Sequence, residues 1–263
     1  MLVLLPPSET KRPGGRRTPL DLARLGLPAL RPEREAVVDA LLALSGDADA
    51  AARVLKLSSR QLGEIEINAA LRHGPTLPAV DRYTGVLYDA LDPASLDGGA
   101  RRWLGKHVLI HAAPFGPVGA LDKIPAYRLG AAVTLPGLPP LRRVWAGAVT
   151  TALAQLRVPF ILDLRSEAYV ALGPVPSTIP AAYVRVVTSG ADGQVRALNH
   201  FNKAAKGTLT RTLAEQRPVS VLRTADDLAI VSGVRAGERI VTDGQSRLTP
   251  NARVRVLPAK AAA

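Results

Sequence analysis

Short, nearly continuous apolar runs recur along the chain and are bounded by proline, glycine or charged residues. The clearest are residues 2–5, 108–112 and 160–164. Runs of this length without polar alternation are typical of strands buried on both faces. We therefore predict that these three segments form the core strands of a sheet.

Longer stretches carry apolar residues at helical spacing. A stripe through Leu41 begins after Pro32 and ends at Gly46. Ser58 or Ser59 caps the next predicted helix, which closes at Gly74. Its expected inward positions are Leu62, Ile65 and Ala69. Further helices are predicted at residues 83–91, at residues 139–156, just after Ser166, and across residues 198–213.

The last third of the chain contains turn signals typical of β structure. Asp192 and Gly193 separate two strand-like runs and predict a hairpin. After about residue 215, strand-sized runs alternate with glycine-containing turns. We predict a mixed α/β domain over residues 1–214, with one large mixed sheet covered by helices, and a small all-β segment over residues 215–263.

Composition adds a strong positive charge to this picture. The 263 residues include 34 basic and 22 acidic side chains, a net charge of +12, and the pI is about 10.7. A balance this basic favours a polyanionic partner, and DNA is the partner we expect. A competing interpretation is that the arginine excess reflects a GC-rich genome. Because there is no cysteine, export signal or membrane-length apolar run, we expect a cytoplasmic protein.

The stretch beginning at His200 combines charge with helical spacing. One face would carry Phe201, Ala205, Leu209 and Leu213. Another face would carry Asn199, Lys203, Lys206 and Thr210. Two lysines one turn apart, beside hydrogen-bond donors, could hold a phosphate. The alternative is an ordinary amphipathic helix whose lysine face is solvated.

Other polar and aromatic residues could join these lysines in one anion-binding surface. Lys11 follows the first strand, and Tyr127 and Arg128 are adjacent in sequence. The full set of candidate nucleic-acid or anion-binding residues is Lys11, Arg82, Tyr127, Arg128, Asn202, Lys203, Lys206 and Arg211.

Motifs for catalysis or for cofactors are missing from the sequence. There is no phosphate-binding Walker loop, dinucleotide glycine fingerprint or nucleophile elbow, so we expect neither an enzyme nor a cofactor. His107 and His111 would lie about 13 Å apart on a strand, too far to share an ion, so no metal is expected.

Six segments, in order over roughly residues 1–214, resemble the YaaA family of peroxide-stress proteins. They are Pro7-Ser-Glu-Thr-Lys11, Arg82-Tyr-Thr-Gly85, Phe115-Gly with Leu121-Asp and Ile124-Pro-Ala-Tyr-Arg-Leu129, Trp145, Asp163-Leu-Arg-Ser-Glu-Ala-Tyr169, and His200-Phe-Asn-Lys-Ala-Ala-Lys-Gly207. The resemblance implies a mixed α/β fold with a basic cleft that binds DNA. It also implies a cytoplasmic role in limiting iron-dependent peroxide damage.

The resemblance further implies that Lys11, Arg128, Lys203 and Lys206 line the cleft. It places a helix-hairpin-helix-like element near residues 58–71, where such an element would present main-chain N–H groups to phosphates. Glu64 and Glu66 oppose phosphate binding by this element, and the chain departs from the family pattern at residues 111–114 and 119–120.

Residues 231–250 resemble the last β segment of the periplasmic adaptor subunits of efflux pumps. We interpret this second resemblance as the mark of a chimeric chain. Three functional hypotheses follow from the sequence. The first is a non-enzymatic DNA-binding stress protein. The second is an enzyme or receptor for a phosphorylated small molecule, with an anion pocket at Lys11, Tyr127, Arg128 and Lys203. The third is a partner-binding module that uses the tail.

Overall fold

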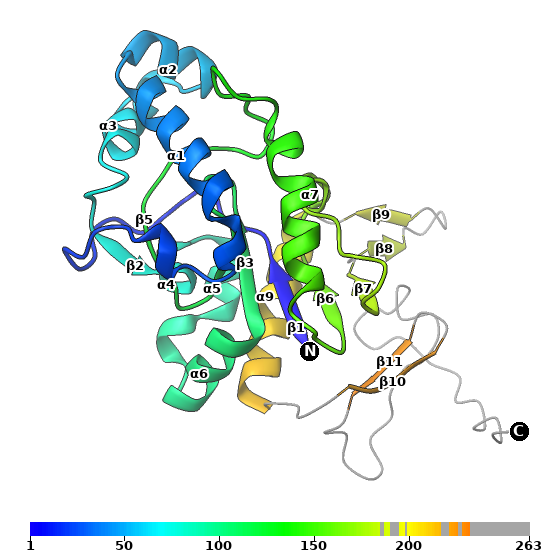
Figure 1. Ribbon diagram of the computed structural model, residues 1–263. Helices are drawn as coiled ribbons and strands as arrows, with labels where there is room; N and C mark the ends of the chain where they lie inside the picture. Colours follow the sequence, from blue (N-terminus) through cyan, green and yellow to red (C-terminus); the bar gives the residue numbers. More distant parts are fainter. Residues whose placement is uncertain (185–186, 190–194, 198, 217–220, 226–227, 232–263) are drawn as a thin grey trace, which may run out of the picture.

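The computed structural model describes residues 1–184, 187–189, 195–197, 199–216, 221–225 and 228–231. Its centre is a five-stranded sheet in the order β4-β3-β1-β6-β7 (Figure 1). The strands are β1 (Leu2–Leu5), β2 (Thr76–Pro78), β3 (Val108–Ala112), β4 (Gly116–Gly119), β5 (Lys123–Pro125), β6 (Ile161–Asp163), β7 (Ala181–Tyr183), β8 (Val187–Ser189), β9 (Val195–Ala197), β10 (Val221–Ala225) and β11 (Leu228–Val231). The mixed α/β architecture predicted from the apolar runs is confirmed.

Helices and single helical turns connect and cover these strands. The α-helices are α1 (Arg31–Ser45), α2 (Ala48–Val54), α3 (Gly63–Ala69), α4 (Ala79–Arg82), α5 (Val86–Leu91), α6 (Gly98–His107), α7 (Leu141–Ala154), α8 (Glu167–Ala171) and α9 (Asn199–Gln216). Four 3-10 turns are η1 (Leu22–Arg24), η2 (Pro28–Leu30), η3 (Ser59–Gln61) and η4 (Pro93–Ser95). None of the helices in the described residues has the length and hydropathy needed to cross a bilayer.

Strand β1 is the middle of the sheet, and all four of its residues are buried. It pairs in parallel with β3 on one side, where Leu4 lies opposite Leu109, and with β6 on the other side, where Leu4 lies opposite Asp163. Parallel strands covered on both faces have no solvent side, which explains why residues 2–5 show no polar alternation. The strands predicted at 2–5, 108–112 and 160–164 are confirmed with small differences in their ends.

Helix α7 covers the face of the sheet that is in front in Figure 1, and α9 lies behind β1. Trp145 of α7 is fully buried and donates its indole N–H to the carbonyl of Ala113 at 3.0 Å. Its ring packs on Gly116, whose φ of 62° and missing side chain permit the contact. The long helix predicted after Pro140 is therefore confirmed, together with its central anchor.

Helices α1, α2 and α3 pack together at one end of the molecule. Ser58 and Gln61 form the predicted cap, in a 3-10 turn that precedes α3. The predicted inward face of this helix was only partly right. Ile65 is buried, but Leu62 is 47% exposed and Ala69 is also exposed. Asn68 takes the buried position, because its amide bonds to the main chain of Arg128.

The helix predicted over residues 83–91 is shorter than expected. Tyr83 is extended, Gly85 has a φ of 92°, and α5 begins only at Val86. The amide group of Gly85 donates to the carboxylate of Asp89 at 3.2 Å, which satisfies one free N–H at the start of the helix. The hydrophobic pattern did not predict α2 or α6.

The face that helix α9 turns to the core is rotated by about one residue from the one that its apolar residues predict. Lys206, Gly207 and Thr210 are buried, whereas Ala205 is exposed and Leu209 is only partly buried. A Cβ atom on Gly207 would overlap the main-chain carbonyl of Leu87, so α9 and α5 are in backbone contact there. The interpretation of a solvated lysine face holds for Lys203, which is exposed, but not for Lys206, which this rotation of the helix buries.

The described residues of the C-terminal part form two small antiparallel pairs. Strand β8 pairs with β9, as the predicted hairpin requires, and β10 pairs with β11. The Asp192-Gly193 turn lies outside the described residues, as do residues 232–263 with most of the predicted all-β segment.

A candidate anion-binding pocket

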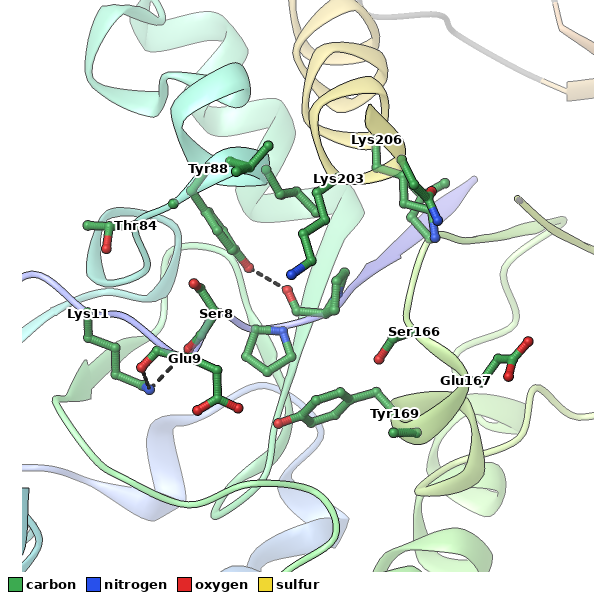
Figure 2. A pocket seen from close by; sticks show the side chains of 18 of the residues that line it. Ser8, Glu9, Lys11, Thr84, Tyr88, Ser166, Glu167, Tyr169, Lys203 and Lys206 are labelled. Carbon is green, nitrogen blue, oxygen red and sulfur yellow. Dashed lines mark hydrogen bonds between the residues drawn. The ribbon is translucent and has the colours of Figure 1, made fainter. Parts of the chain in front are cut away.

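A pocket of about 870 Å³ opens at the carboxyl ends of β1 and β6 (Figure 2). The chain leaves β1 toward β3 on one side and later enters β6 on the other side. Adjacent parallel strands whose connections run in opposite directions leave a crevice between their carboxyl ends, where α/β proteins bind ligands. Pro6, Pro7 and Ser8 after β1, and Leu164 and Ser166 after β6, line this crevice.

Three further walls complete the pocket. One is the start of α5 and the turn before it, one is α9, and one is the segment after β5. The lining residues from these walls are Thr84, Gly85, Val86, Leu87, Tyr88, Tyr127, Leu129, Asn202, Lys203 and Lys206. The remaining lining residues are Glu9, Lys11, Glu167, Ala168, Tyr169 and Tyr183. Segments from the two ends of the described chain therefore meet at one site.

Lys206 is the most unusual charge in the pocket, since only 5% of the residue is exposed. Its Nζ donates to the main-chain carbonyl of Arg165 at 3.3 Å and lies 5.5 Å from the centre of the Tyr183 ring. Burial lowers the pKa of Lys206, and the charge of Asp163 partly offsets this effect. A buried ammonium held by a carbonyl and a ring keeps an electrostatic cost that a bound anion would reduce.

Lys203 and Asn202 extend the same side of the pocket. Figure 2 shows Lys203 reaching from α9 into the pocket. The side-chain oxygen of Asn202 is buried and has no hydrogen-bond partner among the described residues. The structure thus brings Asn202, Lys203 and Lys206 to one wall, as the sequence analysis proposed for the two lysines.

A buried ionic cluster fixes the carbonyl that holds Lys206. Arg165 is bidentate on Asp163, with bonds of 2.9 and 2.7 Å to the two carboxylate oxygens. Its remaining amino group lies 2.9 Å from Nδ1 of His111 and donates to the carbonyl of Tyr169 at 3.3 Å. Because every part of the Arg165 guanidinium is engaged, its backbone and the start of α8 are held rigidly beside the pocket.

His111 is neutral in this cluster. Burial, and then the charge of Arg165, lower its pKa well below the usual value. Its Nδ1 faces an arginine that can only donate, so the proton of the neutral ring is assigned to Nε2. Nε2 is buried without a partner among the described residues.

Lys11 lies on the other side of the pocket and is held by neutral groups. Its Nζ donates to the carbonyls of Ser8 and Glu9 at 3.1 and 3.2 Å. It lies 4.1 Å from the centre of the Tyr127 ring, and the Tyr127 hydroxyl is 2.8 Å from that of Tyr83. The predicted pair of Lys11 and Tyr127 is therefore in direct contact.

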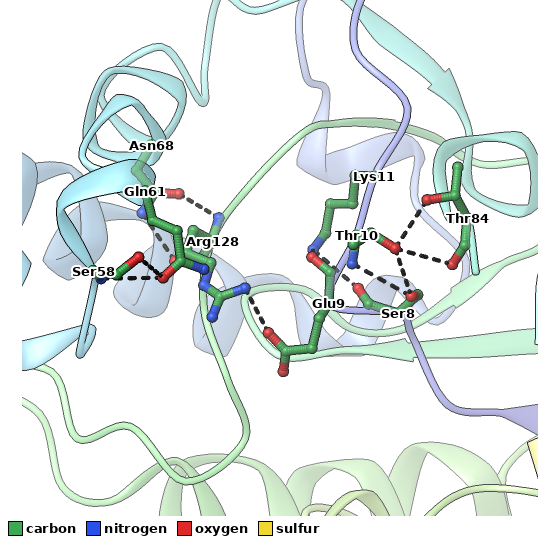
Figure 3. Close-up of polar contacts among 9 residues, drawn as sticks. All are labelled: Ser8, Glu9, Thr10, Lys11, Ser58, Gln61, Asn68, Thr84 and Arg128. Atoms are coloured by element: carbon green, nitrogen blue, oxygen red, sulfur yellow. Dashed lines mark hydrogen bonds and ion pairs between the residues drawn. The ribbon is translucent and has the colours of Figure 1, made fainter. Parts of the chain in front are cut away.

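Arg128 reaches the pocket only through Glu9. Its guanidinium is 2.7 Å from the Glu9 carboxylate, and its main chain is fixed by Asn68 of α3 (Figure 3). Arg128 is absent from the pocket lining, whereas Glu9 is part of it. In this structure Arg128 pairs with an acidic residue at the pocket edge, and its role as a direct ligand stays a prediction.

Two other predicted site residues lie outside this pocket. Arg82 is fully buried and donates to main-chain carbonyls of Arg12, Gly14, Pro75 and Ile124, so it holds the loop after β1 in place. Arg211 of α9 bonds to Leu91, Asp92, Ser95 and Glu215. Both guanidinium groups are occupied by structural partners.

Only part of the aromatic wall was predicted from the sequence, through Tyr127 and the segment that ends at Tyr169. The chain has five tyrosines, and four of them line the pocket while Tyr83 bonds to one of the four. Tyr88 and Tyr183 were not singled out, because one lies within a short helix and the other ends a strand. The small number of tyrosines could have indicated them. The chain has few, and each one lies beside a proposed motif or the end of a strand.

The histidines do not converge on a metal. His107 ends α6, where its ring stacks on Trp103 at 4.8 Å, while His111 is buried in β3. Within the described part of the chain, no three His, Asp, Glu or Cys side chains are close enough to hold an ion. The pocket therefore offers ammonium groups, hydroxyls and aromatic faces, which suit a ligand with both phosphate and ring components.

A family sequence model and individual relatives place the chain in the same family. The sequence model of the family described as peroxide stress protein YaaA matches residues 1–229. A UPF0246 protein of Corynebacterium efficiens is 45% identical over 218 residues, which are 81% of this chain and 85% of that protein. A UPF0246 protein of Streptomyces coelicolor is 40% identical over 237 residues, which are 87% of this chain and 90% of that protein.

The family match bears on the predicted origin of the C-terminal segment. It runs past residue 214 and includes β10 and the start of β11. None of these matches supports an efflux-adaptor origin for the tail.

Proposed function

The chain belongs to the peroxide stress protein YaaA family, and on that basis we propose that it binds DNA through this pocket as a cytoplasmic stress-response protein. In this proposal it limits iron-dependent peroxide damage by binding the target of that damage. The sequence contains no cysteine, so thiol-based removal of peroxide is not available to these residues. Binding is a more suitable role for the groups that the pocket presents.

The observation that carries the proposal is the buried ammonium of Lys206. Its described partners are a carbonyl and an aromatic ring, and the exposed amine of Lys203 lies one turn away on the same wall. A phosphate between these two amines would relieve the cost of the buried charge and form charge-assisted hydrogen bonds. Phosphate contacts of this kind supply most of the non-specific affinity for DNA.

Positive charge continues outside the pocket. The loop after Lys11 carries Arg12, Arg16 and Arg17, all exposed and without an ion pair among the described contacts. The buried guanidinium of Arg82 fixes this loop by donating hydrogen bonds to the carbonyls of Arg12 and Gly14. We propose that these arginines contact phosphates that flank the one in the pocket.

The helical unit on the other side of the pocket is the proposed helix-hairpin-helix-like element. Helices α2 and α3 pack against each other, and the turn before α3 is capped by Ser58 and Gln61. Asn68, Arg128 and Glu9 link this unit to the pocket edge (Figure 3). Free N–H groups at the start of such short helices are suited to phosphates, although Glu64 and Glu66 there oppose an anion.

A second candidate function is an enzyme or receptor for a phosphorylated small molecule. The specific observation in its favour is the pocket volume of about 870 Å³. This lies within the range of about 300–1,000 Å³ that is usual for small-ligand sites. The mixture of three lysines with tyrosine rings would suit a nucleotide as well as it suits one residue of a strand.

Binding measurements distinguish the two functions. Fluorescence anisotropy with a labelled duplex is compared with calorimetric titration of nucleoside monophosphates at 50 mM salt. The DNA proposal predicts that the duplex binds much more tightly than any monophosphate. It also predicts that Lys203→Ala with Lys206→Met weakens duplex binding while the protein stays folded. Tight binding of a monophosphate with no measurable binding of the duplex would favour the second function.

A further inference from the structure

Lys11, like Lys206, is held by main-chain carbonyl oxygen and an aromatic ring. Its two hydrogen-bond acceptors are the uncharged carbonyls of Ser8 and Glu9, and its third neighbour is the Tyr127 ring. The nearest carboxylate in sequence, that of Glu9, is turned toward Arg128 at 2.7 Å (Figure 3). Among the described residues the amine thus has no direct anionic partner.

This environment favours the neutral amine. Burial lowers the pKa of Lys11 from 10.5 to about 8, more than the charges of Glu9 and Glu64 raise it. At neutral pH a larger share of molecules therefore carries a neutral Lys11 than would carry a neutral exposed lysine. The two hydrogens of a neutral amine match its two carbonyl acceptors, so deprotonation loses neither bond and leaves the nitrogen lone pair available for reaction.

Groups for proton transfer line the same pocket. The hydroxyl of Tyr169 is a neutral phenol, because burial and the charge of Glu9 raise its pKa well above the usual value. Glu9 is a carboxylate whose side chain is 70% exposed at the pocket edge. A phenol that can donate a proton and a carboxylate that can accept one are both within the lining that contains the Lys11 amine.

We propose that Lys11 is the nucleophile of an imine-forming site in this pocket, with an aldehyde that neighbours a phosphate as its substrate. The proposal rests on the proposed phosphate site at Lys203 and Lys206, which would place the aldehyde against the amine. In DNA the matching group is the ring-opened deoxyribose of a position that has lost its base. A phosphorylated small aldehyde carries the same chemistry.

The reaction balances without an external oxidant or reductant. The lone pair of the neutral Lys11 nitrogen attacks the carbonyl carbon, and the C=O pair moves to oxygen, which takes a proton from Tyr169. The nitrogen loses one proton to Glu9, the hydroxyl group leaves as water with that proton, and the second nitrogen proton passes to the Tyr169 oxygen, so that Glu9 and Tyr169 end as they began. The product is a C=N bond between the substrate carbon and Lys11. Addition of water reverses it.

Reductive trapping tests this inference on the full chain. The probe is a duplex with one base-free deoxyribose, incubated with the protein and sodium cyanoborohydride. We expect a covalent protein–DNA product whose peptide mass map places the modification on Lys11. Trapping should be about tenfold slower or worse with Lys11→Arg, and equally slow with Lys11→Met, which keeps the apolar stem. The matched control Lys106→Arg, at an exposed site on α6, should trap at the wild-type rate.

Separate arms identify the source of the aldehyde and separate this inference from the DNA proposal. Glyceraldehyde 3-phosphate replaces the damaged duplex in one arm, and binding of an intact duplex is measured in another. Trapping of the sugar phosphate at Lys11 with no duplex binding keeps the imine site and overturns the DNA proposal. Duplex binding without trapping, or with trapping spread over other lysines and unchanged by Lys11→Arg, overturns the imine site alone.

Discussion

Gly207 of α9 lies directly against the main-chain carbonyl of Leu87 in α5, with no room between them for a Cβ atom. This contact sets the rotation of α9, and the rotation carries Lys206 inward beside Arg165. The position of the anion site therefore depends on a glycine that contacts no ligand.

Gly207→Ala tests this dependence. We expect the added methyl group to push α9 from α5, lowering the free energy of unfolding by about 2 kcal/mol and weakening DNA binding. The control is Gly147→Ala in α7, where nothing lies within 4 Å of the position that the new methyl group would take. That change should stabilise the protein by up to about 1 kcal/mol, because alanine favours the helix. Thermal unfolding of both variants checks the difference, and equal melting temperatures would contradict it.

Arg82 is expected to act on stability, since its guanidinium donates to four main-chain carbonyls and none of it is exposed. Arg82→Met should lower the free energy of unfolding by about 3 kcal/mol or more, because buried acceptors lose their donor. Arg17→Met, at an exposed position of the same basic loop, should change it by less than about 0.5 kcal/mol. Urea unfolding measures both. If Arg82→Met lowered the free energy of unfolding as little as Arg17→Met, Arg82 would not be structural and would again be a candidate DNA ligand.

His111 should make stability depend on acidity. Its pKa lies well below the usual 6.5 in the folded protein, so it stays neutral there while the unfolded chain takes up a proton. The unfolded state then binds more protons below pH 6.5, and stability falls as pH decreases, with a slope approaching about 1.4 kcal/mol per pH unit. Urea titrations between pH 7 and 5 should show this loss in the wild type and a smaller loss in His111→Gln. The exposed His73→Gln should behave as wild type, and a wild-type slope in His111→Gln would contradict the assignment.

The ion pair of Arg128 and Glu9 predicts a rescue. Arg128→Ala should weaken DNA binding about threefold to tenfold, because an unpaired carboxylate then faces the pocket. Glu9→Gln in the same protein should restore most of the affinity. A direct phosphate contact by Arg128 would give no such recovery, so anisotropy titrations of the single and double variants separate the two roles.

The sequence predicts the core strands of this protein well, but it does not predict which charged residues are buried. The core strands can be predicted from uninterrupted apolar runs such as residues 2–5. A strand that is buried on both faces needs apolar residues at successive positions. The facing of α9 could not be predicted, since Gly207 and Thr210 are not apolar and the interhelical contact that buries them is non-local. The pattern of Ala205 and Leu209 therefore indicated a face about one residue away from the buried one.

The same limit applies to arginine. Counting basic residues treats each as a surface charge, yet Arg34, Arg82 and Arg165 are fully buried. Arg34 donates to the carbonyls of Phe115, Pro117 and Gly26, of which the first two are distant in sequence. Such partners are main-chain atoms with no residue-type signature, so only the fold shows which arginines are structural.

The salt dependence of DNA binding tests the central claim most directly. The affinity of the wild type for a labelled duplex is measured from 50 to 200 mM salt beside two variants with the same loss of charge. One is Lys203→Ala with Lys206→Met, and the other is Arg142→Ala with Arg143→Ala on the exposed side of α7. Each neutralised phosphate contributes about 0.9 to the slope of log affinity against log salt, so the lysine variant, which loses the one phosphate held between the two amines, should lose about 0.9. The arginine control should keep the wild-type slope. Equal slopes for the lysine variant and the wild type would show that the pocket does not hold the DNA backbone.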